Sequence, residues 1–335
     1  MGIKIIQKSL WPVIALLALV WVNRLSAQET DQIAKQITWS PDGTMIAVGF
    51  DSNECDIQNP HSENLLILDA TTLEVVTPGP VKSCLELFLD WTPNSEAIAI
   101  IGSHEFRIWS VTKHEFHTIP LYFLLATSIR LSPDGALLAM TDATGTARTI
   151  ELETGELSNP FPIGGFLGLA WNPHGSQLAI GQINEVKIFN VDSQDEVGTI
   201  IYEYGIIEQI HWSQSGSRLV IYRVAIERGQ ERDLDVVDAD LMEIITTISM
   251  SDYIDPQDGL TDIALNPDGN LIAGTSPLSG IYIWDTTTGE LVTHFEQESI
   301  YAIDWSPDGS RLAYVPSGND DELVGFLDDF SEAAP

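Results

Sequence analysis

One short signature recurs seven times along this chain of 335 residues. Each copy opens with tryptophan or leucine and continues as a variant of Ser-Pro-Asp-Gly. The seven copies begin at Trp39, Trp91, Leu131, Trp171, Trp212, Leu265 and Trp305. Four of the six spacings between successive starts are 40 or 41 residues, and the other two are 52 and 53. Such a period indicates one supersecondary unit that stacks against copies of itself.

Each signature lies at the junction of two predicted strands. An apolar residue stands two positions before it, as Ile37 does before Trp39, so the two side chains share one face of a strand. The Pro-Asp-Gly sequence favours a tight turn, because proline withholds an N–H from the ladder and glycine accepts a positive φ. A second strand follows, with a small residue eight positions after the opening one: Ala47, Ala99, Ala139, Ala179, Val220, Ala273 and Ala313.

Two further strands complete the predicted repeat. Third strands are expected at 65–69, 106–110, 148–152, 186–190, 234–238, 281–285 and 323–327. Turns into a fourth strand are clearest at 153–157 and 286–295. Four short antiparallel strands without a helix predict an all-β, seven-bladed β-propeller over 28–335. Only 328–335 follows the last third strand, so the seventh blade is predicted to be three-stranded or to include the N-terminal segment 28–36.

The repeats resemble those of the WD-repeat family. The best match runs from 263-IALNPDGNLIAG-274 to the Trp284-Asp285 dipeptide, and Trp109-Ser110 and Phe189-Asn190 are looser versions. The resemblance covers nearly the whole chain after residue 27, and the repeats are equally similar to related bacterial envelope propellers. We therefore expect a bacterial-type member, and residues 1–27 add the expectation of export. The chain lacks the Gly-His dipeptide before its first strands and mostly lacks the aspartate between second and third strands. The hydrogen-bonded tetrad of the family is therefore not predicted here.

Residues 1–27 have the layout of a secretory signal peptide. Lys4 and Lys8 precede an uncharged apolar run of thirteen residues at 10–22, and Leu25-Ser26-Ala27 offers small residues for cleavage. A membrane span needs about 20 residues, so this run is short for one. We therefore expect an exported protein, periplasmic or extracellular. The alternative is an uncleaved anchor at 10–22, which would be the only membrane contact of the protein.

The chain is strongly acidic. Its formal net charge is −34, and removal of residues 1–27 takes away three basic and no acidic residues, which gives −37. Nucleic acid and anionic lipid both require lysine and arginine, so direct binding to either is not expected. The acidity favours solubility in an exposed compartment, and its alternative role is the attraction of cations or of a basic partner.

The two cysteines suit an oxidising compartment. Cys55 lies in the insertion 51–64 of the first repeat, and Cys84 precedes the first strand of the second repeat. Loops between second and third strands emerge on the same face of a propeller as connections between blades. A disulfide between Cys55 and Cys84 is therefore geometrically reasonable. The alternative is two buried thiols that do not meet.

No catalytic, cofactor or metal site is predicted. The sequence has no Gly-x-Ser-x-Gly motif, and its histidines show no spacing typical of a metal site. The acidic runs 226–235, 252–262 and 319–322 do not match an EF-hand loop, although calcium binding is the alternative to simple solvation there. The enzymatic alternative is a lactonase-like hydrolase with a metal at the central channel. Its candidate ligands are Asp90, His211 and Asp304.

Aromatic residues in the blade-to-blade connections mark a predicted binding face. They are Phe123, Phe166, Tyr204, Tyr253 and Tyr301. Aromatic anchors ringed by polar loops are typical of recognition surfaces, whereas aromatics near strand ends also pack between blades. From these features we expect a non-catalytic, monomeric scaffold that binds a protein or peptide through the loops of one face.

Overall fold

The computed structural model describes residues 33–51, 65–79, 88–101, 105–120, 126–142, 144–163, 168–225, 232–255, 258–316, 323–328 and 330. All of them belong to one compact unit, Ile33–Pro335. The predicted signal peptide at 1–27 and the proposed disulfide partners Cys55 and Cys84 lie outside the described residues, so both remain predictions. Among the residues described, no helix is long and apolar enough to cross a membrane.

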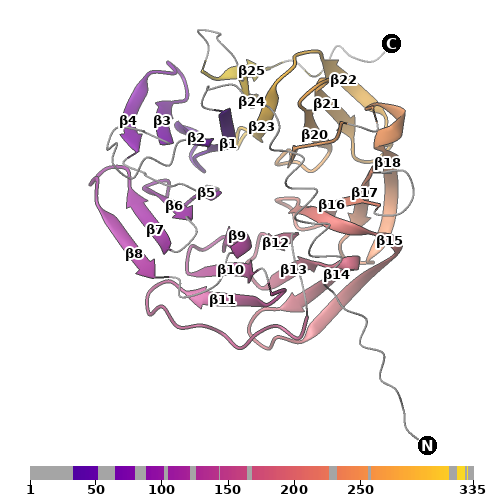
Figure 1. Cartoon of the computed structure of the whole chain (residues 1–335), viewed down its shortest axis with the longest axis horizontal. Helices are drawn as coiled ribbons and strands as arrows, with labels where there is room; N and C mark the ends of the chain where they lie inside the picture. Colours follow the sequence, from indigo (N-terminus) through magenta and orange to yellow (C-terminus); the bar gives the residue numbers. More distant parts are fainter. Residues whose placement is uncertain are drawn as a thin grey trace, which may run out of the picture. The chain divides into compact units, whose positions relative to one another are not determined.

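The described strands pair antiparallel in six sheets around a ring, which confirms the predicted β-propeller (Figure 1). One sheet has seven strands, and its division into two blades is consistent with the predicted number of seven. Blade one contains β1 (Ile33–Trp39), β2 (Met45–Asp51), β3 (Leu65–Asp69) and β4 (Val75–Gly79). Blade two contains β5 (Phe88–Trp91), β6 (Ala97–Ile101), β7 (Glu105–Ser110) and β8 (Phe116–Pro120). Blade three contains β9 (Ala126–Leu131), β10 (Leu137–Asp142) and β11 (Ala147–Glu151).

The remaining strands continue the ring. Blade four contains β12 (Leu169–Trp171), β13 (Gln177–Gly181), β14 (Ile183–Asn190) and the first part of β15 (Glu196–Trp212). Blade five contains the second part of β15, then β16 (Arg218–Val224), β17 (Arg232–Asp238) and β18 (Glu243–Ser249). Blade six contains β19 (Asp262–Leu265), β20 (Leu271–Ser276), β21 (Gly280–Asp285) and β22 (Leu291–Phe295). Blade seven contains β23 (Ile300–Trp305), β24 (Leu312–Pro316) and β25 (Gly325–Leu327), and a short 3-10 turn, Met250–Asp252, follows β18.

Two blades depart from four strands among the described residues. Blade seven has three, as one of the two predictions for it required. Blade three was expected to have a fourth strand after 153–157, but there the pairing is a single bridge between Ile150 and Leu157. Pro160 and Pro162 follow closely, and neither offers an N–H, so the ladder cannot be extended there in the usual way.

The signature turns form as predicted and also join the blades. Gly43 and Gly135 adopt φ of 71° and 73°, a conformation that favours glycine. A Cβ on Gly135 would lie 3.0 Å from Cδ of Pro93 in the preceding blade, and one on Gly43 would lie 3.7 Å from Cδ of Pro307. The second contact crosses from blade seven to blade one, so the ring closes there with the same packing used elsewhere.

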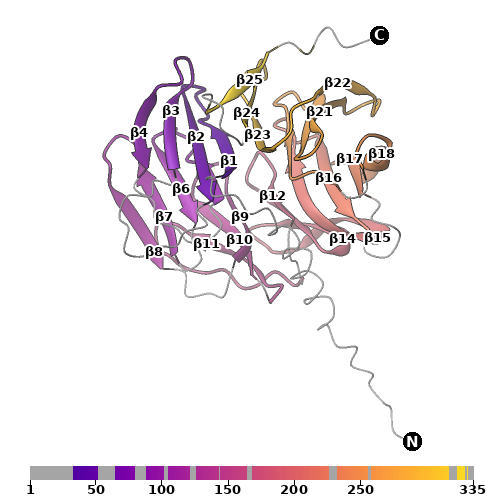
Figure 2. The ribbon, with the colours of Figure 1, turned by 45° about the horizontal axis from the view of Figure 1, so that its top comes forward.

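The hydrophobic cores lie between neighbouring blades, whose sheets face one another (Figure 2). The small residue of each second strand is fully buried in these cores, as Ala47 and Ala139 illustrate. The core that closes the ring joins Ile37 and Val48 of blade one to Val315 of blade seven. Because the described parts of these two blades share no sheet, contacts of side chains join them.

Candidate functional site

The topology divides the propeller into two faces. In an antiparallel blade, loops between second and third strands and connections to the next blade lie at one end of the strands. The Pro-Asp-Gly turns lie at the opposite end. We call the first end the connection face. The aromatic residues that were predicted from the sequence to bind a partner belong to connections on this face.

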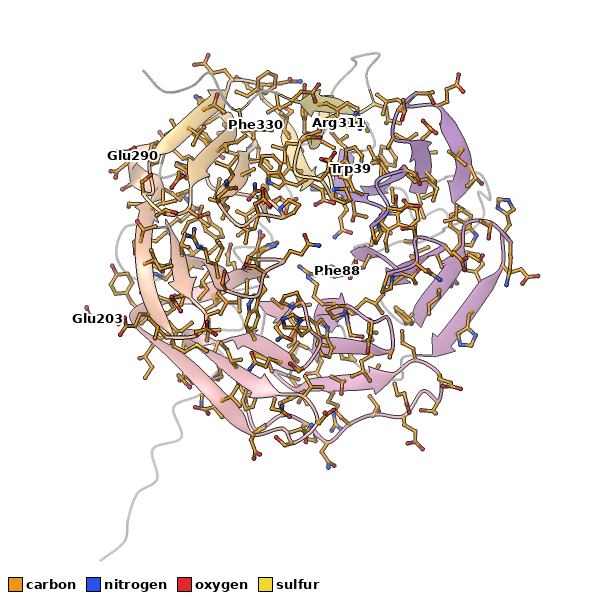
Figure 3. The ribbon with its side chains drawn as sticks, turned by 180° about the vertical axis from the view of Figure 1, so that it is seen from behind. Trp39, Phe88, Glu203, Glu290, Arg311 and Phe330 are labelled. Atoms are coloured by element: carbon orange, nitrogen blue, oxygen red, sulfur yellow. The ribbon has the colours of Figure 1, made fainter. Side chains whose placement is uncertain are left out.

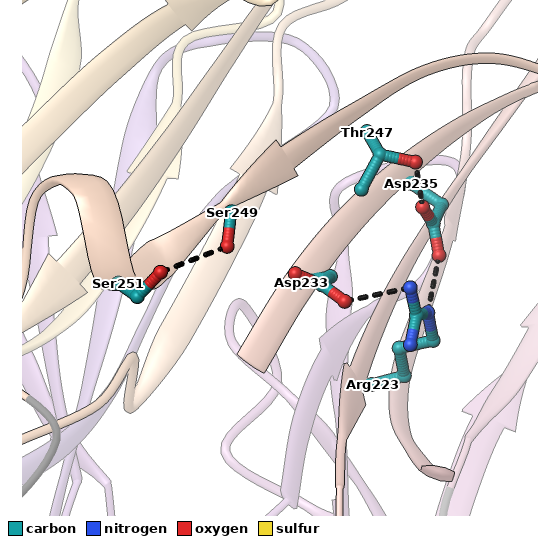
Figure 4. Close-up of polar contacts among 6 residues, drawn as sticks. All are labelled: Arg223, Asp233, Asp235, Thr247, Ser249 and Ser251. Carbon is teal, nitrogen blue, oxygen red and sulfur yellow. Dashed lines mark hydrogen bonds and ion pairs between the residues drawn. The ribbon is translucent and has the colours of Figure 1, made fainter. Parts of the chain in front are cut away.

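Tyr204 lies on this face, where β15 crosses from blade four to blade five. The guanidinium of Arg223 lies 5.5 Å from the centroid of the Tyr204 ring and 5.0 Å from that of Tyr202. The same guanidinium pairs with Asp233 at 2.6 Å and with Asp235 at 2.7 Å (Figure 4). We call Tyr204, Arg223, Asp233 and Asp235 the blade-five cluster.

Electrostatics hold the blade-five cluster in one arrangement. Asp235 is fully buried and also accepts a hydrogen bond from the hydroxyl of Thr247. Burial lowers the pKa of Arg223, but the attraction of Asp235, and then of Asp233, outweighs it, so the pKa is raised. Arg223 therefore stays charged and can bind the faces of two aromatic rings. Tyr204 itself remains half-buried, with part of its side chain open to solvent.

Tyr253 has a packing role. Its ring meets Trp284 edge-on at 5.7 Å and lies 6.4 Å from Tyr282, and its carbonyl oxygen accepts a hydrogen bond from the Tyr282 hydroxyl. Tyr282 is stacked in turn on His294 at 3.9 Å. Tyr253 therefore packs against the core between blades five and six, which is the alternative that the sequence left open.

Tyr301 lies at the junction of blades seven and one, with Nζ of Lys35 5.1 Å from its ring centroid. It is half-buried. Phe123 and Phe166 lie outside the described residues, so the structure does not bring the predicted aromatic set together as a whole.

Polar side chains near the axis of the ring accept hydrogen bonds from the backbone of neighbouring blades. We call these hydrogen bonds the clasps. The innermost strand of each blade has an edge that faces the axis, and its backbone N–H groups need acceptors. Asp304 accepts from the N–H of Trp39 at 2.8 Å. Asp90 accepts from Leu131 at 3.2 Å in the equivalent position of blade two. The sequence did not reveal this role, because each N–H donor lies in a neighbouring blade and far along the chain.

A second clasp lies two residues earlier on the innermost strand. Asp262 accepts from the N–H of Ile303 at 3.1 Å, and the Oε1 of Gln36 accepts from Leu89 at 2.6 Å. The indoles of the signature add a third link to the preceding blade through Nε1. Trp39, Trp91, Trp171 and Trp305 donate to the carbonyls of Asp304, Thr38, Arg130 and Ala264 at 3.0–3.2 Å.

Burial shifts the pKa values of these axial residues, and the hydrogen bonds to their carboxyl groups oppose the shift. Burial raises the pKa of Asp262 and of Asp304 to about 7, and the charge of Asp262 adds to the rise at Asp304. Burial raises the pKa of Asp90 to about 6 against the opposing charge of Arg130. Burial, and then Arg130, lowers the pKa of His211 to about 3, so this imidazole is neutral at pH 7. All five side chains are half-buried and keep some access to solvent.

The axial residues therefore form a mixed structural cluster of three carboxyl groups, one guanidinium and one imidazole. Asp90 and Asp304, the candidates for a catalytic metal, are committed to backbone N–H groups of neighbouring blades. In the described part of the chain, no group of three or more His, Cys, Asp or Glu side chains is placed to hold a metal ion.

The acidic connection at 252–262 does not converge on one point. Asp258 is buried and accepts from the hydroxyls of Ser276 and Ser279 and from the N–H of Gly259. Asp252 is exposed, and Asp262 belongs to the axial clasps. Asp258 and Asp262 thus have different partners, and the described carboxylates of this connection do not share one site.

The tryptophans at the third strand lack the hydrogen bonds of a tetrad. Nε1 of Trp109 and Nε1 of Trp284 are buried with no hydrogen-bond partner among the described residues. Next to Trp284, the second strand carries Gly274, where a Cβ would lie 3.1 Å from the indole. The absence of these hydrogen bonds agrees with the sequence, which lacks the Gly-His dipeptide and mostly lacks the aspartate of the family's tetrad.

Comparison with solved structures confirms the fold. The chain is similar to Kuenenia stuttgartiensis hydrazine synthase, with a TM-score of 0.73, 12% identity, and coverage of 91% of this chain and 97% of that one. It is also similar to the β-propeller domain of Myceliophteria thermophila Cps50 (Swd1), with a TM-score of 0.72, 13% identity, and coverage of 89% and 99%. No protein-family model and no curated protein matches the chain. At this identity, the likeness is one of fold alone.

Proposed function

We propose that this β-propeller is a non-catalytic, exported scaffold that binds a protein or peptide through its connection face. The observation that carries the proposal is the blade-five cluster. Its aromatic ring, Tyr204, is half-buried and lies beside the guanidinium of Arg223, which two buried carboxylates fix in place. Preorganised aromatic and arginine side chains contribute most of the binding energy at many protein interfaces.

The charge distribution supports a basic partner. Nine of the ten lysines and arginines in the described residues contact a ring, carbonyl or carboxylate of this chain. They are Lys35, Arg107, Arg130, Arg148, Lys187, Arg218, Arg223, Arg232 and Arg311. With cations engaged internally and a net charge of −34, the surface offers mainly carboxylates to a partner. Such a surface attracts basic proteins and repels acidic ones.

The non-catalytic part of the proposal is supported by the clasps. The axial aspartates that would serve a metal-dependent hydrolase already accept backbone hydrogen bonds between blades. Export is supported by the layout of residues 1–27 alone.

Affinity capture from the envelope fraction of the native organism tests the proposal. The baits are residues 28–335, the Tyr204→Ala variant, and the Phe116→Ala variant as a matched control. Phe116 is also partly exposed and also lies beside an arginine, Arg107, at 5.4 Å, but on the outer strand of blade two. We expect a partner that the wild type and Phe116→Ala retain and that Tyr204→Ala loses, with all three baits equally folded by circular dichroism. Equal retention by all three baits, or no partner at all, would contradict the proposal.

A further inference from the structure

Two junctions of the ring are joined by the same clasp with different side chains. Three residues before the signature, Gln36 of blade one accepts a hydrogen bond from the N–H of Leu89 at 2.6 Å. In the same position of blade six, Asp262 accepts from the N–H of Ile303 at 3.1 Å. Leu89 and Ile303 are equivalent too, since each stands two residues before a signature. A neutral amide therefore suffices as acceptor here, and the carboxyl group of Asp262 adds the capacity to gain or lose a proton.

Both oxygens of Asp262 are engaged with the backbone. Oδ2 accepts from Ile303 across the junction, and Oδ1 accepts from the N–H of Ile263 on its own strand at 3.0 Å. Burial raises the pKa of Asp262 from an ordinary 3.8 to about 7, against the opposing effects of these two hydrogen bonds and of the Arg130 charge. The folded protein therefore keeps this proton at a pH where a solvated aspartate has released it.

Other titratable groups lie around Asp262. β15, β20 and β23 pack against β19, and β20 carries no titratable side chain. The charged and titratable residues of β23, of the blade-five part of β15 and of β9 are Tyr301, Asp304, Glu208, His211 and Arg130. His211 has a pKa of about 3, so it stays neutral where Asp262 titrates. The charge of Asp262 raises the pKa of Asp304, so a test must distinguish these two carboxyl groups.

Neutral hydrogen bonds also join blades six and seven. Oγ1 of Thr275 donates to the carbonyl of Ile300 at 2.7 Å, and Nε1 of Trp305 donates to the carbonyl of Ala264 at 3.1 Å. Neither bond involves a group that titrates near neutral pH. Loss of the Asp262 clasp therefore loosens the axial edge of this junction and leaves the two blades in contact.

Opening of this edge becomes easier as the pH rises. Once the edge is open, Asp262 is solvated and titrates at its ordinary pKa of 3.8, so opening is favoured progressively from about pH 4 to pH 7 and levels off above 7. We propose that the clasp between Asp262 and Ile303 is a proton-responsive lock between blades six and seven, tight at mildly acidic pH and looser at neutral pH. Because β19 follows the acidic connection between blades five and six, this lock lies at the base of the connection face.

Amide hydrogen exchange of residues 28–335, followed by NMR, tests the lock. Protection is expressed relative to an unstructured chain at the same pH, which removes the pH dependence of exchange itself. We expect the protection of the Ile303 N–H to fall roughly tenfold between pH 5 and pH 7. One titrating group contributes at most about tenfold per pH unit, and Asp262 is only half-buried.

The N–H of Leu89 is the matched control in the same sample. Its acceptor, Gln36, does not titrate, so its protection is expected to stay constant. The match extends to the next residue, because Asp90 follows Leu89 as Asp304 follows Ile303, and burial raises the pKa of both aspartates. An equal fall at both N–H groups would assign the response to these neighbours or to the whole ring, and would overturn the proposal.

Two reciprocal substitutions separate Asp262 from the other groups. Asp262→Asn keeps an acceptor for Ile303 and removes the titration, so the protection of Ile303 is expected to become independent of pH. Gln36→Glu introduces a carboxyl group into the neutral clasp, so the protection of Leu89 is expected to fall as the pH rises. A response of Ile303 that survives in Asp262→Asn, or no response of Leu89 in Gln36→Glu, would overturn the proposal.

A measurement on the wild type needs no variant. The NMR shift of the Asp262 carboxyl carbon is expected to titrate with a midpoint near 7. A midpoint near the ordinary 3.8 would overturn the proposal even if Asp262→Asn does not fold. These measurements involve no binding partner, so their outcome is independent of the proposed function.

Discussion

Asp304 makes two of the hydrogen bonds that close the ring. Its carboxylate accepts the N–H of Trp39 and its carbonyl accepts the indole of the same residue, so one aspartate of blade seven holds the first strand of blade one twice. The hydrogen bond from Trp39 lowers the pKa of this carboxyl group, whereas burial raises it. The effect of burial is the larger one, so the pKa is raised. The protonated form is therefore favoured in the folded protein.

The substitution Asp304→Asn is expected to alter how stability depends on pH. A folded-state pKa of about 7 against an ordinary value of 3.8 means that the folded protein binds more protons between these values, so this group's stabilisation is lost as the pH rises through 7. Asparagine still accepts the N–H of Trp39 and carries no charge. We expect the variant to gain about 1 kcal/mol over the wild type at pH 8 and nothing at pH 4, measured by urea unfolding.

The control for this prediction is Asp308→Asn. Hydrogen bonds from Ser306, and then from Ser310, hold the pKa of Asp308 at about 2, so its stabilisation is present above pH 4 and lost as the pH falls toward 2. This variant is expected to be less stable than the wild type at pH 8. An Asp304→Asn variant that also loses stability at pH 8 would show that the carboxylate is the favoured form.

At the scale of single elements, the signature turn has two functions. It reverses the chain between the first two strands, and it packs against the equivalent turn of the preceding blade. Local sequence accounts for the first function, because glycine at the fifth position tolerates the positive φ. The second depends on the distance between Gly135 and Pro93, which are far apart in the sequence.

The substitutions Gly135→Ala and Gly155→Ala separate these two functions. Both glycines have a φ of 73°, but nothing lies within 4 Å of a Cβ on Gly155, whereas one on Gly135 lies 3.0 Å from Pro93. Gly155→Ala is expected to cost about 1–2 kcal/mol from its backbone alone. Gly135→Ala is expected to cost roughly 1 kcal/mol more, because the neighbouring turn must shift. Thermal unfolding of both variants measures the difference. Equal losses in the free energy of unfolding would show that Pro93 can move away from the added methyl group without strain.

The molecule as a whole closes into a ring without a strand shared between its first and last blades in the described residues. In the described residues, side-chain packing and the two hydrogen bonds of Asp304 join these blades. The guanidinium of Arg311 lies 5.0 Å from the ring centroid of Trp39, which it faces across the junction in Figure 3. It also lies 4.8 Å from the ring centroid of Phe326 on β25, so it links blade one to the second and third strands of blade seven. Phe330 meets Trp305 edge-on at 4.8 Å and extends the contact on the other side of blade seven.

Net charge opposes this compact ring. Residues 28–335 carry a formal charge of −37, and the ion pairs of Lys187 and Arg223 offset only a small part of it. Salt shortens the range of repulsion to about 10 Å at 0.1 M. We therefore expect the melting temperature of residues 28–335 to rise by several degrees between 20 mM and 500 mM sodium chloride. Sodium chloride is nearly neutral toward hydrophobic burial, so a temperature that stays constant would mean that the carboxylates are too dispersed to repel.

The sequence by itself determined the repeat, the strands and the propeller. Alternation around Ile37 and Trp39 and the turn at Gly43 are local properties, and local properties that recur seven times specify one stacked unit. It did not reveal that the described part of blade three has a single bridge in place of a fourth strand, since a turn at 153–157 resembles the others and only the later Pro160 and Pro162 lack an N–H for the ladder.

Only the tertiary structure decided what the polar and aromatic residues do. Asp90 and Asp304 are candidate metal ligands in the sequence but hydrogen-bond acceptors between blades in the fold, because their partners lie in the next blade around the ring. Tyr204 and Tyr253 occupy comparable connections, yet one lies against the cation of Arg223 and the other packs against the core of blade six. Contacts of this kind join residues tens of positions apart, and spacing along one chain does not encode which distant side chains a closed ring brings into contact.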